Sequence, residues 1–418
     1  CLAAILLVVN LSSCVDLEPE PLSFFAPENT FMDKEGLEAL LITSRKQIKW
    51  EWFGDAFNAG YCETPLVYEY AWSDVSVMGA PEVKEIHNLE TQLTPTTSMA
   101  LHLRYWDLAW NGIKYANTVI SRVPKSTIDN ETDKNELLAE GYFHRAYWYY
   151  LLVNQWGDVP LLLEEITEPK LDFYTVSRMK ILQQMKTDME FAVKWLPKNV
   201  KPGCVNRAAG EHLLAKIYLS TGDFQLAVDA TTRCINDYGL HLMKERFGVN
   251  AEDASLDVFN DLFQEDNISS SENKEAIFVV QERYGIEGNV APNGSARMRN
   301  FVPYWCNGAA VKTPDGKPGT TYDAGPYDGY EWVEKLGRGI AKIRPTNYSQ
   351  YAIWGKCGND LRHNENNWFD ISRLKYNRPA SKGGSATYFG TPVQRSFVTD
   401  TMPVSYTHLR AHETVLDL

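Results

Sequence analysis

Three clusters place Trp and Tyr beside polar residues and are the part of the sequence best suited to binding a ligand. Indole and phenol rings stack on flat apolar ligand faces, and amides and carboxylates pair with polar ligand groups. For any single ring, packing inside a core or a loop is the alternative. The clusters are Tyr68, Tyr70 and Trp72 with Asp74, then Tyr304 and Trp305 with Asn307, and Tyr327, Tyr330 and Trp332 with Asp328 and Glu331.

No sequence motif indicates catalysis. The patterns H-E-x-x-H, G-x-S-x-G, G-x-G-x-x-G and the Walker loop do not occur, and the 7 Cys form no C-x-x-C pair. We therefore expect no enzyme activity, no cofactor and no metal site. Loop carboxylates such as Asp315, Asp323 and Asp328 lack the fixed spacing of a calcium loop. A glycosidase pair of carboxylates stays open, because its geometry is set in three dimensions.

The composition allows a packed core and disfavours nucleic acid as a partner. The chain has 418 residues, of which 44% are hydrophobic and 23% charged, with a formal net charge of −13. Nucleic-acid-binding proteins need clustered Lys and Arg, which this acidic balance does not favour. Aromatic residues reach 12% of the chain, which is more than core packing usually needs.

Two long helices are predicted to support the candidate residues. Apolar residues recur at steps of three and four from Leu101 to Val123, and Pro124 ends that helix. The next helix has Asp133 as its expected N-cap and Glu136 as its capping-box partner, and it ends at about Trp156. It is apolar nearly all round, so we expect it to be buried. Residues assigned to structural roles on these helices are Trp106, Trp110, Trp148 and Trp156, together with His144 and Arg145 in an ion pair or cap.

Three further helices are predicted at 177–196, 207–220 and 223–238. The last two are joined at Thr221-Gly222, and their spacing matches one tetratricopeptide unit. Small residues let two antiparallel helices approach closely, and aromatic residues fill the groove between them. The residues at the repeat positions are Leu214, Ala215, Tyr218, Gly222, Phe224 and Ala227.

From about Phe247 the helical period stops and Gly, Pro, Asn and Tyr dominate. The run from Ala276 to Val280 is a strand candidate, and the rest reads as long loops with a few strands. We interpret Asp360 and Arg362, which flank Leu361, as a structural turn with its own hydrogen bonds. Loops of this length in a compact protein are usually functional.

The two ends of the sequence need a separate interpretation. Residues Leu2 to Leu11 form an apolar run of signal-peptide length, and Leu11-Ser12-Ser13-Cys14 resembles a bacterial lipobox. Cys14 would then be the lipidated first residue of the mature protein, followed by an acidic, Pro-containing tether. The segment from Val404 to Thr414 reads like one frame of a sequencing adapter, so no expectation rests on 404–418. Free thiols are expected at Cys62, Cys204, Cys234, Cys306 and Cys357, because an odd number cannot all pair.

Taken in order, these pieces resemble the SusD/RagB family of outer-membrane nutrient-binding lipoproteins. Each piece alone is weak, whereas their order and spacing are specific. Besides Cys14 and its tether, the matching pieces are Trp72-Ser73-Asp74, Trp106 to Asn117, Ala139 to Ala146, Trp156 to Leu161, Leu214 to Leu219, Asn273 to Phe278, Asn359 to Arg362, Leu374 to Tyr376 and Met402-Pro403.

The resemblance implies a mainly α fold, a SusD-like α/α superhelix of tetratricopeptide-like helical pairs with an irregular, loop-rich ligand-binding subdomain. It also implies a lipid-anchored protein of the outer-membrane cell surface in a Gram-negative bacterium. Such a protein binds oligosaccharides, or in some members peptides, and delivers them to a SusC-type TonB-dependent transporter without catalysing a reaction. For this ligand the candidate contact residues are Trp72, Asp74, Tyr304, Trp305 and Trp332.

The expected organisation has five parts. They are a signal-peptide remnant with the lipobox at 1–13, a lipidated tether at 14–30, a helical region at 31–246, a truncated loop-rich region at 247–403 and the adapter-like 404–418. Two other functions stay open. One is a tetratricopeptide adaptor that binds protein partners, which the loop-rich second half disfavours, and the other is a glycoside hydrolase.

Overall fold

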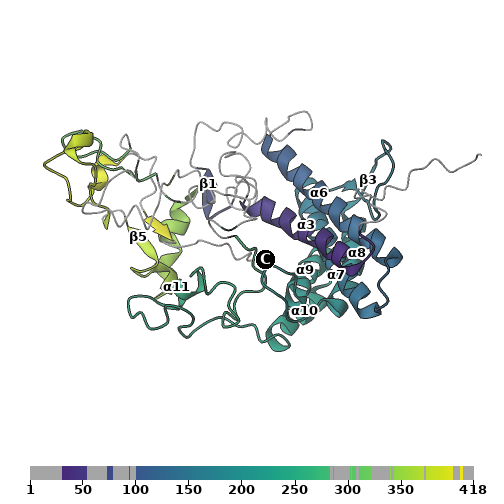
Figure 1. Ribbon diagram of the computed structural model, residues 1–418. Helices are drawn as coiled ribbons and strands as arrows, with labels where there is room; N and C mark the ends of the chain where they lie inside the picture. The colour runs from purple at the N-terminus through teal and green to yellow at the C-terminus, as the bar shows by residue number, and fades with distance from the viewer. Residues whose placement is uncertain are drawn as a thin grey trace, which may run out of the picture.

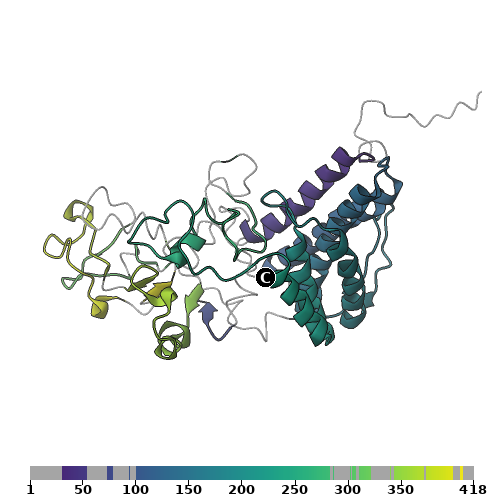
Figure 2. The same ribbon diagram turned by 90° about the horizontal axis from the view of Figure 1, so that it is seen from below.

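The computed structural model separates a helical part from an irregular part (Figure 1). It describes residues 31–53, 73–78, 100–282, 304–306, 310–321, 343–370, 373–398 and 405–407, and the single residues 94, 286, 302 and 339. The helices gather at one end of the molecule, and the short strands and turns of the second half extend toward the other (Figure 2). The predicted mainly α fold is therefore confirmed.

The helical part is built from long helices that pack on their sequence neighbours. Helix α7 packs against α6, α8 and α3, and α9 packs against α8 and α10. Apart from the start of α7, the predicted helix ends agree with the observed ones to within about two residues, whereas α3 was not predicted. The helices are α3 (Lys34–Phe53), α6 (Ala100–Arg122), α7 (Glu131–Trp156), α8 (Arg178–Trp195), α9 (Arg207–Thr221) and α10 (Phe224–Asn236).

Helix α7 is buried along most of its length, as its all-round apolar sequence predicts. Its Trp148 is fully buried and lies against Gly112 of α6. A Cβ atom at Gly112 would lie only 2.1 Å from the Trp148 indole nitrogen, so only glycine lets the two helices approach this closely. The indole therefore sets the spacing between α6 and α7.

The pair α9 and α10 has the geometry expected of a tetratricopeptide unit. Gly222 joins the helices with a φ of 82°, in the left-handed region that favours glycine. The small residues Ala227 and Ala230 of α10 are buried in the main core that α9 also lines. The prediction of a tight helical pair is confirmed.

The predicted N-cap of α7 is wrong by one turn. The helix begins at Glu131, and the Asn130 side chain accepts a hydrogen bond from the amide of Thr132 at 2.8 Å. Asp133 lies inside the first turn and forms an ion pair with Lys34 of α3 at 2.9 Å. Both residue types cap helices well, so the choice between them depends on where α3 lies.

Arg145 of α7 is buried and bound to the neighbouring helix α8, as predicted. Its guanidinium donates to Asp188 at 2.8 Å and to the carbonyl of Leu163 at 2.7 Å. The same group donates to Asn117 of α6 at 3.1 Å. One side chain therefore ties together two helices and the segment that follows α7.

Past α10 the chain forms a smaller core made largely of turns. This second core contains Val302, Trp305, Cys306, Val311, Leu374, Tyr376 and Val393. Its regular elements are short: α11 (Val258–Leu262), β4 (Ile343–Pro345), the π-helix η3 (Tyr348–Ala352), the 3-10 turns η4 (Trp354–Lys356) and η5 (Leu361–His363), and β5 (Trp368–Asp370), which pairs with β6 (Ser405–Thr407).

The strand predicted at 276–280 does not form. Phe278 and Val280 instead insert into the main helical core, where Phe278 meets the ring of Phe143 with centroids 6.2 Å apart. A short apolar run has the same sequence pattern in a strand and in an extended segment that packs on helices. Among the described cysteines, Cys204, Cys234 and Cys357 are free thiols, as predicted.

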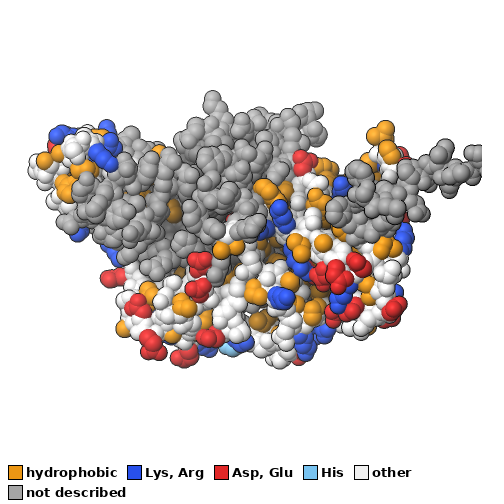
Figure 3. Space-filling view, viewed as in Figure 1, with side chains coloured by type: hydrophobic (Ala, Val, Ile, Leu, Met, Phe, Trp, Pro, Cys, Tyr) orange, Lys and Arg blue, Asp and Glu red, His pale blue; other side chains and the backbone are white. Residues whose placement is uncertain are grey.

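Figure 3 shows acidic and basic side chains interspersed on the visible face of the helical part, with hydrophobic ones scattered between them. Ion pairs account for part of this mixture, such as Lys186 of α8 with Asp223 at 2.8 Å. Within the described ranges, no helix combines the length and the apolar character needed to cross a bilayer.

Candidate functional site

The predicted ligand residues are only partly within the described chain. Cys14, Trp72 and Trp332 lie outside the described residues. Asp74, Tyr304 and Trp305 are described, and they lie in two different places. Asp74 precedes a short strand in the first half, while Tyr304 and Trp305 belong to the second core.

Trp305 packs inside the second core, and its role as a ligand contact stays a prediction. Its exposed fraction is 0%, and it lies in the second core with Val311 and Tyr376. The hydroxyl of Thr320 donates to its carbonyl. Tyr304 is half-buried against the same core.

Asp74 is held against the loop-rich half by strand pairing. Strand β1 (Ser76–Met78) pairs antiparallel with β4, with Ser76 opposite Pro345. The hydroxyl of Thr346 donates to the carbonyl of Asp74 at 2.7 Å, and that of Ser349 donates to the carbonyl of Val75 at 2.5 Å. Segments almost 270 residues apart in the chain therefore meet beside the exposed Asp74 carboxylate.

Beyond β4 lies a group of rings that we call the aromatic surface: Tyr348, Tyr351, Trp354, His363 and Trp368. The imidazole of His363 stacks on Trp354, with centroids 4.8 Å apart and an interplanar angle of 20°. Trp368 lies 4.5 Å from His363 and meets Trp354 edge-on at 5.4 Å. Tyr348 and Tyr351 remain 52% and 48% exposed, so their faces are open to a ligand.

The predicted turn at Asp360 supports this surface. Arg362 donates to both carboxylate oxygens of Asp360, at 2.9 and 2.6 Å, and its amide donates to the same carboxylate. These hydrogen bonds lower the pKa of Asp360 to about 2. The guanidinium also lies 5.8 Å from the centre of the Trp354 ring. The interpretation as a turn with its own hydrogen bonds is confirmed.

A polar network ties the aromatic surface to α11. The Asp257 carboxylate caps α11 and accepts from the side chains of Asn364 at 2.6 Å and Asn367 at 2.9 Å. Asn367 is buried and precedes Trp368 directly. The Trp354 indole donates to the carbonyl of Ser349 at 2.9 Å. Side-chain hydrogen bonds therefore help to hold the rings, in addition to the short elements that carry them.

Sequence reasoning missed the aromatic surface. The available signal was the recurrence of Tyr348, Tyr351 and Trp354 at three-residue intervals. The partner rings His363 and Trp368 come from a separate segment. Nothing in the sequence joins the two segments, because their contact depends on the Asn367 network.

Two Trp residues assigned to structural roles also have an open side. Trp106 and Trp110 of α6 pack against the main core but are only half-buried, and both line a cavity. Trp148 is fully buried, as predicted. In the part of the chain that the structure describes, no group of His, Cys, Asp or Glu is arranged to hold a metal ion.

Comparison with protein families gives a match over the helical part of the chain. Residues 63–219 match a SusD-like family model described as "Starch-binding associating with outer membrane". SusD-like protein P2 of Formosa agariphila is 27% identical over 238 residues, which is 56% of this chain and 45% of that protein. The chain thus matches less than half the length of this relative.

Solved structures share the fold at low identity. A SusD superfamily protein from Bacteroides vulgatus superposes with a TM-score of 0.60 at 17% identity, covering 91% of this chain and 68% of that one. A laminarin-binding SusD-like protein superposes with a TM-score of 0.58 at 17% identity, covering 91% and 76%. At this identity the likeness shows the shared fold alone.

Proposed function

We propose that this chain is a member of the SusD-like family, which it resembles over residues 63–219, and that it binds oligosaccharides at the cell surface and delivers them to a SusC-type TonB-dependent transporter. The matching family is described as starch-binding and as associating with the outer membrane. One relative in fold is named for binding laminarin, which supports a glycan as the ligand class.

The observation that carries this proposal is the pairing of β1 with β4, which brings the backbone of Asp74 to Thr346, just before the helical turn that carries Tyr348 and Tyr351. The exposed rings of Tyr348 and Tyr351 offer faces for the C–H side of a sugar. The Asp74 carboxylate and the Arg362 guanidinium offer partners for its hydroxyls. Trp72 and Trp332 remain proposed contacts.

Removing one exposed ring tests the site. We expect Tyr351→Ala to weaken retention in native gels that contain the bound polysaccharide by about 3- to 10-fold, since one stacking contact is lost. The melting temperature should stay nearly unchanged, because the ring is 48% exposed. The polysaccharide is chosen beforehand with a glycan array probed by the chain that starts after Cys14.

The matched control is Tyr174→Ala, which removes a 77% exposed ring from the helical part. Equal retention of the Tyr351 and Tyr174 variants would exclude the aromatic surface as the glycan site. If the parent chain and both variants bind no glycan on the array, glycan binding is rejected as the function.

The anchoring and the partner are tested in cells. We expect Cys14 to incorporate labelled fatty acid, and Cys14→Ser to abolish that label. When the lipidated chain is purified in detergent, an outer-membrane transporter should co-purify as its dominant partner. Recovery of unrelated soluble proteins instead would favour the adaptor function, and steady release of reducing ends from polysaccharide would favour a hydrolase.

A further inference from the structure

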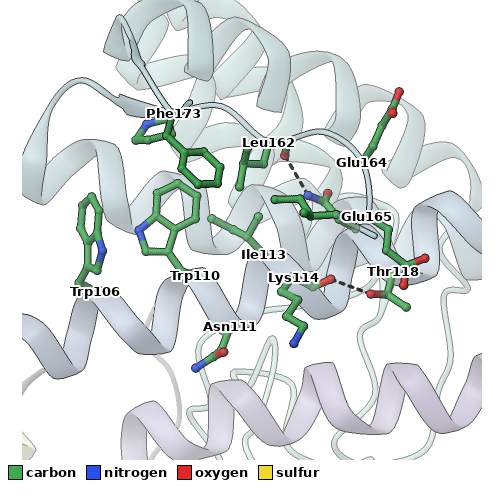
Figure 4. Close-up of a pocket in the computed structure, with 13 residues that line it drawn as sticks. Trp106, Trp110, Asn111, Ile113, Lys114, Thr118, Leu162, Glu164, Glu165 and Phe173 are labelled. Atoms are coloured by element: carbon green, nitrogen blue, oxygen red, sulfur yellow. Dashed lines mark hydrogen bonds between the residues drawn. The ribbon is translucent and has the colours of Figure 1, made fainter. Parts of the chain in front are cut away.

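A second candidate site lies in the helical part, away from the aromatic surface. A cavity of about 630 Å³ opens between α6 and the segment that joins β2 (Val159–Pro160) to β3 (Thr175–Val176). Its volume falls within the usual range for small-molecule sites. Figure 4 shows Trp106, Trp110 and Ile113 along α6 with Phe173 and Leu162 opposite.

The segment opposite α6 is fixed in place by hydrogen bonds. The amide of Leu162 donates to the Tyr149 hydroxyl at 2.6 Å, and its carbonyl accepts from the Asn117 side chain at 3.0 Å. Glu165 forms a bidentate ion pair with Arg122 of α6, with its shorter contact at 2.6 Å. The cavity wall is therefore formed before any ligand arrives, which lowers the entropy cost of binding.

The inner polar groups of the cavity are already used. Asn117 binds Leu162 and Arg145, Thr118 donates to the carbonyl of Lys114 at 3.0 Å, and Glu165 is paired with Arg122. A sugar inserted here would find free polar side chains only among the exposed residues Asn111, Lys114 and Glu164, so hydroxyls on its inner side would lack partners, and each one costs free energy. The cavity therefore does not suit a polyhydroxylated ring.

Apart from these polar groups, the cavity is lined by apolar side chains, and its largest are the rings of Trp106, Trp110 and Phe173. Trp106 and Trp110 meet edge-on, with centroids 5.4 Å apart and an angle of 65°. Phe173 is 47% exposed and lines the opposite wall. Rings prefer such offset and edge-to-face contacts with other rings, and these contacts add to simple area burial.

One donor inside this wall has no acceptor. The indole nitrogen of Trp110 is buried and has no hydrogen-bond partner among the described residues. Figure 4 shows it on the side of the ring that faces Trp106. Because the Trp110 ring is only half-buried, a small rotation brings this N–H to an oxygen on a ligand in the cavity.

We propose that this cavity binds an aromatic ring that carries an acceptor oxygen, either in a free small molecule or as an aryl substituent on a glycan. The ring packs between the α6 indoles and Phe173, and its oxygen accepts from Trp110. This site is separate from the proposed glycan surface, and it neither requires glycan binding nor excludes it.

A pair of matched probes tests the ring. Methyl 3-phenylpropanoate and methyl 3-cyclohexylpropanoate share one heavy-atom skeleton, and only the first has a flat aromatic ring; both are titrated against the full chain by ligand-observed NMR. We expect the phenyl ester to bind with a dissociation constant of about 1 mM, as its size allows, and the cyclohexyl ester to bind clearly more weakly. Equal binding of both esters would reduce the cavity to a nonspecific apolar pocket and overturn the proposal.

Two variants test the residues. Phe173→Ala should weaken the phenyl ester by about 10-fold, and Trp110→Phe, which keeps a ring but removes the donor, by about 3-fold. Phe224→Ala, which removes a 65% exposed ring of α10 that does not line the cavity, is the control and should change nothing. The proposal is wrong if Phe173→Ala binds the phenyl ester as tightly as the parent chain does.

Phenyl and methyl β-glucosides separate the two sources of the ring. Binding of the phenyl glucoside with the same dependence on Phe173 supports an aryl group carried by a glycan. Binding of the ester without the phenyl glucoside supports a free aromatic compound. If neither aryl probe binds, the cavity has no aryl ligand, and the proposed glycan function is unaffected.

Discussion

An aromatic side chain can fill a core or contact a ligand, and its exposed fraction decides between the two roles. Trp305 lies in the second core with no exposed surface, whereas Tyr351 and Phe173 keep about half of theirs. Truncating a buried ring leaves a cavity, while truncating an exposed ring removes a contact surface. The two classes of residue therefore give different experimental signatures.

We expect Trp305→Ala to lower the free energy of unfolding by about 3 to 5 kcal/mol, because the lost indole leaves a cavity in the second core. Urea unfolding followed by circular dichroism measures this change. Tyr304→Phe, which keeps the half-buried ring, is the matched control and should stay within about 0.5 kcal/mol of the parent chain. A stable Trp305→Ala variant that no longer binds glycan would support a ligand role for Trp305.

At the scale of single helices, caps and cross-helix ion pairs position α7. Its N-terminus is capped by Asn130, and Glu140 in its middle is bound by Arg45 of α3 through two hydrogen bonds at 2.6 and 2.8 Å. Both contacts act on α7, which contributes more buried residues to the main core than any other helix described. Substitutions that remove the Asn130 cap or the Arg45–Glu140 pair should therefore lower the free energy of unfolding of the whole protein.

Asn130→Ala should cost about 1 kcal/mol, because the first-turn amides of α7 lose their acceptor. Asp133→Ala tests the cap that the sequence pattern favours, and it should cost less because only a partly exposed ion pair with Lys34 is lost. Thermal melts of both variants give the comparison. A larger loss of stability for Asp133→Ala than for Asn130→Ala would indicate that Asp133 is the N-cap of α7.

Arg45→Met should destabilise the protein by about 3 kcal/mol, because it leaves the buried Glu140 carboxylate without its cation. The double variant Arg45→Met with Glu140→Met should recover much of this loss, since neither charge remains. Denaturant titrations of the parent chain, both single variants and the double variant complete the cycle. Additive losses would show that the two residues do not interact.

At the scale of the whole molecule, the same carboxylate links stability to pH. Burial alone would raise the pKa of Glu140, but the nearby His144 and the hydrogen bonds from Arg45 outweigh it, so the pKa lies below the usual 4.5. A carboxyl group with a lowered pKa stabilises the fold fully above its unfolded-state pKa. That contribution disappears as the pH falls through the lower folded-state value.

We therefore expect the free energy of unfolding to fall as the pH drops below about 4.5. Glu140→Gln should be less stable at neutral pH and should show a shallower decline in acid, because its side chain does not titrate. Denaturant midpoints measured from pH 7 to pH 3 test this. An unchanged acid slope in Glu140→Gln would assign the decline to other carboxylates.

Helices, the tight α9–α10 pair and the change to loops near Phe247 follow from the sequence because periodicity, prolines and turn glycines act over a few residues. The strand at 276–280, the cap at Asp133 and the role of Trp305 do not follow from it. Each of those depends on which distant segment supplies the packing partner, such as Phe143 for Phe278 or α3 for Asp133.

The sequence by itself determined the mainly helical scaffold, the loop-rich second half and the abundance of rings suited to binding. Only the tertiary structure decided which rings face outward, because that depends on contacts such as β1 with β4 and Asp257 with Asn367. It also revealed the cavity beside Trp110. Side-chain exposure is a property of the packed chain, and no local pattern of residues encodes it.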